Sequence, residues 1–100
     1  MASPTVRDII DRASTAYDSL LAVAEEVGDE WIYCRDLSNA WRARLNVVAD
    51  TRQDEPAQPA AEAAVAAAAE EVARISDPHR AIDWLSTFPQ VVLIALGERP

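Results

Sequence analysis

Arg44 constrains the interpretation of the sequence most strongly, because it falls among apolar residues. Residues 29–52 have the apolar spacing of a helix, and we take Leu37 as the centre of its apolar face. At about 100° per residue, Arg44 lies only about 20° from that centre. A guanidinium keeps its charge when it is buried, so it needs a partner. The candidates are Glu62 or Asp83, helix-end carbonyls, solvent reached by an extended side chain, a bound anion, or a second subunit.

Two tyrosines extend the anion-binding interpretation. A guanidinium holds a carboxylate or phosphate through two parallel hydrogen bonds, and tyrosine hydroxyls can donate further ones. Arg44, Tyr17 and Tyr33 are therefore the candidate ligand-binding residues of a pocket between helices. Such a pocket would bind a small anionic molecule, with or without catalysis.

The other reactive side chains form no recognisable site in the sequence. His79 follows a predicted helix start, with no nucleophile or acid nearby in the sequence to act with it. Cys34, the single cysteine, lies within an apolar arc and is predicted to be a buried thiol. Glu70 and Glu71 are adjacent and therefore diverge on a helix. The sequence thus predicts no catalytic residue, no metal site and no cofactor.

The composition limits the partners and the compartment. The 100 residues carry a net charge of −8, and all nine basic residues are arginine, so binding to nucleic acid is disfavoured. The N-terminus shows no basic stretch leading into an apolar run, so no secretory signal is expected. The longest apolar run, VVLIAL, is far shorter than the roughly 20 residues of a membrane span. We expect a cytoplasmic protein with no membrane contact.

The first half of the chain predicts two helices joined by a very short connection. Ser3 or Thr5 can cap a helix whose apolar residues recur at three- and four-residue steps as far as Gly28, which supplies the stop. Asp29 can cap the second helix almost at once. So short a connection favours an antiparallel hairpin, although a sharp bend is the alternative.

The second half predicts a linker, an alanine-rich helix and a C-terminal helical segment interrupted by proline. Residues 53–59 are the linker, and Pro59 opens the third helix. Asp77 and Pro78 begin a fourth helix that Pro89 is expected to kink or break. For residues 90–96 we favour a short buried fifth helix, with a strand that pairs between two chains as the alternative. The whole chain, residues 1–100, is predicted to be one all-α domain.

Several large apolar residues exceed what a bundle of this size can cover. Trp84 points about 160° away from the apolar side of its helix, and Trp31 lies at the edge of its own. Exposed aromatic residues beside arginines are typical of protein interfaces. The candidate interface residues are Trp31, Ile32, Trp84, Phe88 and Val91. Irregular packing that buries both sides of Trp84 is the alternative.

These observations favour a non-enzymatic interaction or regulatory module, with either another protein or a second copy of the chain as its partner. A homodimer is the form we expect. The alternative is a protein that binds an anionic small molecule, or an enzyme, with Arg44 as the anion anchor. The two hypotheses differ in what meets Arg44 and in whether Trp84 is covered.

Overall fold

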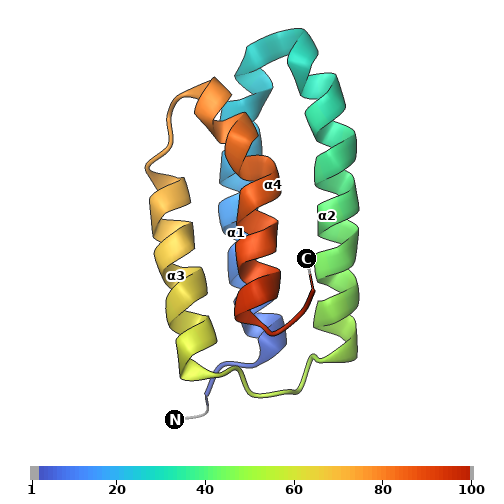
Figure 1. The fold of residues 1–100 in the computed structure, drawn as a ribbon, viewed down its shortest axis with the longest axis vertical. Coiled ribbons are helices and arrows are strands. Elements are labelled where there is room, and N and C mark those ends of the chain that lie inside the picture. The colour runs from blue at the N-terminus through green and yellow to red at the C-terminus, as the bar shows by residue number, and fades with distance from the viewer. Residues whose placement is uncertain (1–2, 100) are drawn as a thin grey trace.

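The structure is a computed structural model that describes residues 3–99, and Figure 1 shows that this part of the chain is a bundle of helices. A single isolated bridge between Thr5 and Pro56 is the only β-type pairing within those residues. The prediction of an all-α fold is confirmed. The elements are α1 (Val6–Ala24), the 3₁₀ helix η1 (Glu25–Glu30), α2 (Trp31–Thr51), α3 (Pro59–Ala73) and α4 (Pro78–Ala95).

The arrangement of the helices leaves α2 and α3 at opposite edges of the bundle. α1 and α4 pack against each other in the middle, and α2 and α3 each contact both of them. α2 and α3 do not contact each other, and Figure 1 shows them on either side of the α1–α4 pair. α1 and α2 run in opposite directions, so the predicted antiparallel hairpin is confirmed. Because α2 is an edge helix, only one side of it meets the core.

The hairpin connection turns at Gly28. This glycine has a φ of 78°, a left-handed conformation that side chains with a Cβ rarely adopt. It lies inside η1, so the chain passes from α1 to α2 without an extended loop. The role predicted for Gly28 from its position after the last apolar residue of the first helix is thereby confirmed.

The capping residues that start α1 and α4 act through their side chains. Thr5 caps α1 by accepting a hydrogen bond from the Asp8 backbone N–H at 3.2 Å, while the Asp8 carboxylate accepts one from the Thr5 N–H at 2.9 Å. The hydrogen bond from the Thr5 backbone N–H to the Asp8 carboxylate, helped by the nearby Thr5 hydroxyl, lowers the pKa of Asp8 below its usual value. Asp77 caps α4 by accepting from the His79 backbone N–H at 3.1 Å, with Pro78 at the first helical position.

α4 is one continuous helix, which corrects our expectation of a break at Pro89 and a separate fifth helix. Residues 90–95 are therefore helical and do not form a strand. Proline has no N–H, so Pro89 cannot donate to the carbonyl of Leu85. The Tyr17 hydroxyl of α1 donates to that carbonyl instead, at 2.8 Å, and supplies the missing hydrogen bond from a neighbouring helix.

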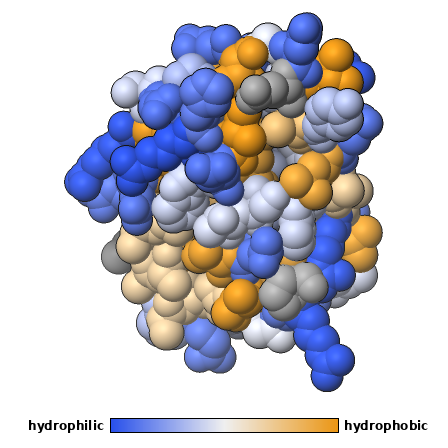
Figure 2. Space-filling view, turned by 45° about the horizontal axis from the view of Figure 1, so that its top comes forward, coloured by the Kyte–Doolittle hydropathy of each residue, from blue (hydrophilic) through white to orange (hydrophobic). Residues whose placement is uncertain are grey.

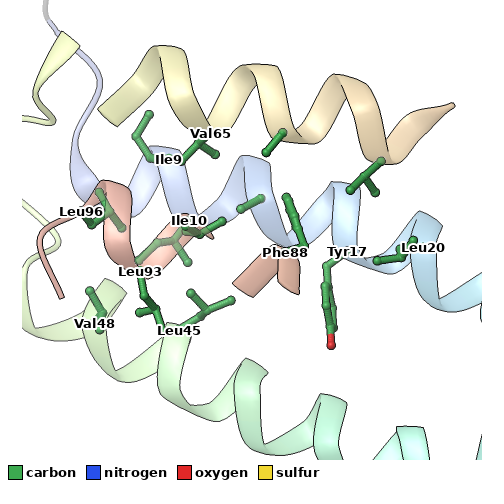
Figure 3. Packing of buried hydrophobic residues seen from close by; sticks show 14 of the residues in the cluster. Ile9, Ile10, Tyr17, Leu20, Leu45, Val48, Val65, Phe88, Leu93 and Leu96 are labelled. Atoms are coloured by element: carbon green, nitrogen blue, oxygen red, sulfur yellow. The ribbon is translucent and has the colours of Figure 1, made fainter. Parts of the chain in front are cut away.

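The hydrophobic core lies between all four helices, and Figure 3 shows part of it. Tyr17 and Phe88 are each only 1% exposed, and their rings stack with centroids 6.4 Å apart. Val65 of α3 and Leu45 of α2 enter the core from opposite edges. The closely packed side chains of α1 and α4 form the centre of the core, and α2 packs against them from one edge.

The segment between α2 and α3 forms hydrogen bonds with the start of α1 and with the end of α4. The carbonyl of Glu55 accepts from the Val6 N–H at 2.8 Å, and the Ala57 N–H donates to the carbonyl of Pro4, also at 2.8 Å. The Arg52 guanidinium donates to the Leu96 carbonyl at 2.8 Å. Segment 52–57 therefore joins the start of α1 to the end of α4.

Candidate functional site

One side of α2 carries large hydrophobic side chains that the fold leaves exposed. Among residues 3–99 such side chains occur on α2 and, at Ile94, on α4. In the view of Figure 2, hydrophobic residues reach the surface in several separate patches, some on the side of the molecule where α2 lies. The α2 residues are Ile32, Tyr33, Leu37 and Val47, which are 55%, 84%, 45% and 61% exposed.

Three of these residues line up with Ala40 and Arg44, which are also exposed. The five positions follow one another at steps of four, three, four and three residues, so they stay within about 40° of one line along the helix. At 1.5 Å per residue the line is about 21 Å long. This spacing is that of a seam along which one helix packs on another. We call these residues the α2 stripe: Tyr33, Leu37, Ala40, Arg44 and Val47.

The α2 stripe is separate from the side of α2 that meets the core. The buried residues of α2 centre about 120° around the helix from the stripe. Leu37 therefore does not mark the centre of the buried face, which corrects our prediction. α1 and α4 both contact α2 from the same direction, so only one side of α2 is covered. The apolar residues of α2 that lie away from this side stay exposed. The buried residues of α2 are Ser38, Leu45, Val48 and Ala49.

Arg44 is exposed, and its guanidinium donates a hydrogen bond to the backbone carbonyl of Arg99. Of the partners that we considered, a carbonyl beyond the end of a helix is thus the one found. Glu62 instead lies 3.7 Å from the guanidinium of Arg12. Because a guanidinium is planar and its hydrogen bonds lie in that plane, one hydrogen bond to Arg99 leaves the flat face of Arg44 available for stacking.

Acidic side chains lie beside the α2 stripe. Asp36 and Asp50 are both exposed and lie on the same flank of the stripe, about 60° and 100° from its centre line. On the other side of α2, Arg42 pairs with Asp18 of α1 at 2.7 Å. Arg42 thus ties α2 to α1, while Arg44 stays on the outer surface.

The predicted pocket residues are not brought together. Tyr17 is buried behind α2, where its hydroxyl donates to the Leu85 carbonyl, whereas Tyr33 is 84% exposed. Burial raises the pKa of Tyr17, and a hydrogen bond with the Ser38 hydroxyl partly opposes that rise. Tyr17 is therefore occupied within the core, and only Tyr33 shares a surface with Arg44.

The predicted interface residues divide into three groups. Ile32 is 55% exposed. Trp31, Trp84 and Val91 are half-buried and pack against the core, as the alternative interpretation of Trp84 proposed. Phe88 is 1% exposed and belongs to the core, so it has no surface to offer a partner. Leu37 and Val47 are also exposed, although the apolar spacing of residues 29–52 predicts a buried face centred on Leu37.

Among residues 3–99, the other chemically active side chains do not gather into a second site. A shallow depression of about 370 Å³ lies between the end of α3 and the start of α4, with both acidic and basic side chains in its wall. Its carboxylate Glu70 pairs with Arg74 at 3.3 Å. Among residues 3–99 there is no group of three or more His, Cys, Asp and Glu side chains placed to hold a metal ion. The same residues include no helix with the length and apolar character needed to cross a membrane.

Comparison with known proteins adds no relationship to this geometry. No protein-family model, no curated protein and no solved structure matches the chain.

Proposed function

We propose that this chain is a non-enzymatic helical interaction module that associates with itself through the α2 stripe. The observation that carries the proposal is the row of exposed residues at helix-packing spacing on an edge helix. A row of exposed apolar residues favours association, because burying them removes their surface from water. Ile32 is 55% exposed on the same helix, about 100° around it from the centre line of the stripe, and it stays a candidate for the edge of the interface.

The acidic character of the chain is compatible with this role. Two copies that each carry a charge of −8 repel one another over their whole surfaces, so only a surface with local complementarity can bring them together. The α2 stripe contains one arginine and no acid, with Asp36 and Asp50 at its flank. It is therefore a place where two negatively charged molecules can approach.

Sedimentation equilibrium of the full chain over a wide concentration range tests the proposal. We expect a concentration-dependent dimer in the unmodified protein and a monomer in the variant Leu37→Asp, which places a charge in the middle of the apolar surface. Ile94→Asp is the matched control, because Ile94 is a similarly large, exposed residue outside the α2 stripe. A monomer at every concentration, or equal loss of dimer in both variants, would contradict the proposal.

A further inference from the structure

We infer that the two copies pair antiparallel along the α2 stripe, with Arg44 of each copy stacked on Tyr33 of the other. This inference rests on the proposed self-association and adds its geometry. It follows from the order of residue types along the stripe, in which an aromatic ring stands at one end and a guanidinium toward the other. The centre between them holds one large and one small apolar residue, Leu37 and Ala40.

A two-fold axis between Leu37 and Ala40 makes the surface its own complement. Such an axis exchanges the two ends of the stripe, so that a single patch serves on both copies. Leu37 and Ala40 are equally far from the axis, and so are Tyr33 and Arg44, four residues farther out on either side. Leu37 then packs on Ala40 of the second copy, and a large side chain fills the space left by a small one.

The contact between Arg44 and Tyr33 uses groups that the fold leaves accessible. Tyr33 is 84% exposed, so its ring offers a face for a cation. The hydrogen bond from Arg44 to the Arg99 carbonyl uses an N–H in the plane of the guanidinium and is compatible with stacking on the face of that group. Asp36 of the second copy lies within one helical turn of Tyr33, so the incoming guanidinium also meets a carboxylate.

A parallel arrangement of the same helices is disfavoured by the same residues. It would place Arg44 opposite Arg44, and two like charges that face each other within an interface oppose association. It would also place Leu37 opposite Leu37 and Ala40 opposite Ala40, so that one layer is crowded and the next is empty. The antiparallel pairing removes both conflicts.

Charge substitutions at Tyr33 and Arg44 separate the two arrangements in sedimentation equilibrium of the full chain. In the antiparallel dimer, Tyr33→Glu faces Arg44 and is expected to leave the dimer dissociation constant unchanged or to lower it. Tyr33→Arg faces the same arginine and is expected to raise that constant at least tenfold. The charge-exchanged double variant Tyr33→Arg/Arg44→Glu is expected to recover most of the loss, because each new arginine then faces a new glutamate.

The results that overturn the inference differ from those that overturn the proposed function. If Tyr33→Glu and Tyr33→Arg both weaken the dimer and the double variant does not recover it, the antiparallel pairing is wrong. Self-association through the stripe would still stand in that case, provided that Leu37→Asp abolishes the dimer and Ile94→Asp does not. A chain that is monomeric at all concentrations would overturn both. Circular dichroism confirms that each variant keeps its helices, since both substituted residues are exposed.

Discussion

The hydrogen bond between Tyr17 and the Leu85 carbonyl makes a quantitative prediction about why α4 continues through Pro89. Replacing Tyr17 by phenylalanine keeps the ring that stacks on Phe88 but removes the hydroxyl. The Leu85 carbonyl then lacks both this donor and an N–H from residue 89. A buried polar group left without a partner costs about 1–3 kcal/mol. We expect a loss of about 2 kcal/mol in unfolding free energy, or roughly 8–16 °C in Tm for a domain of this size.

A double-mutant cycle with Pro89→Ala isolates the mechanism. Alanine at position 89 supplies a backbone N–H that can donate to the Leu85 carbonyl through the ordinary helical hydrogen bond. In that background, Tyr17→Phe is expected to cost about 1 kcal/mol, because the carbonyl keeps one partner. The coupling energy between the two sites is therefore about 1 kcal/mol, within the range seen for residues that share a hydrogen-bonded partner.

Urea unfolding of the four proteins at neutral pH measures the cycle. Tyr33→Phe is the matched control, because Tyr33 is 84% exposed, and its unfolding free energy is expected to stay within about 0.5 kcal/mol of the unmodified protein. The reasoning is refuted if Tyr17→Phe is as stable as the unmodified protein. It is equally refuted if Tyr17→Phe costs the same with proline and with alanine at position 89.

Three further predictions concern stability. Burial raises the pKa of Tyr17 above its usual value of 10.0, so the neutral phenol stabilises the fold below pH 10, and this stabilisation is lost as the pH rises through the folded-state pKa. In urea unfolding between pH 8 and 11, the unfolding free energy of the unmodified protein should fall more steeply with pH than that of Tyr17→Phe. Arg52→Met removes hydrogen bonds to the Leu96 carbonyl and to Glu98, and we expect a loss of about 1–3 kcal/mol in thermal unfolding, with the exposed Arg35→Met as a control that changes little. The buried indole N–H of Trp41 has no hydrogen-bond acceptor among the described residues, so Trp41→Phe removes an unpaired polar group together with part of the ring. We expect Trp41→Phe to lower the unfolding free energy in denaturant by less than the lost side-chain volume alone implies, and a loss above about 3 kcal/mol would contradict this.

The parts of the fold that the sequence predicted are those encoded by neighbouring residues. Thr5 as a cap, Gly28 as a stop and the Asp77–Pro78 start were all recognisable, because capping and left-handed turns depend on residue types a few positions apart. The all-α class followed from the same local patterns. These signals do not require knowledge of which helix packs on which.

The errors in the prediction arise where a distant residue decides the outcome. The continuity of α4 at Pro89 depends on Tyr17, which is far away in the sequence. Nothing in the sequence of α4 itself reveals that Tyr17 will donate to the Leu85 carbonyl. The position of α2 depends on where α1 and α4 contact it, and two apolar sides of that helix were both compatible with its sequence. Arg44 had an identifiable need for a partner, but its partner at Arg99 lies 55 positions away.

The hydrogen bonds of segment 52–57 have a consequence for folding kinetics and local opening. The Val6–Glu55, Ala57–Pro4 and Arg52–Leu96 contacts can form only after distant parts of the chain have met, so they are expected to form late in folding. Once formed, they make this irregular segment resistant to opening. Its Ala57 amide should therefore exchange with solvent at a rate closer to that of helix interiors than to that of an ordinary surface loop. An insertion between residues 53 and 57 is expected to displace the Glu55 carbonyl and the Ala57 N–H and so to release the start of α1, whereas Arg52 precedes the insertion and can keep its contact with the end of α4.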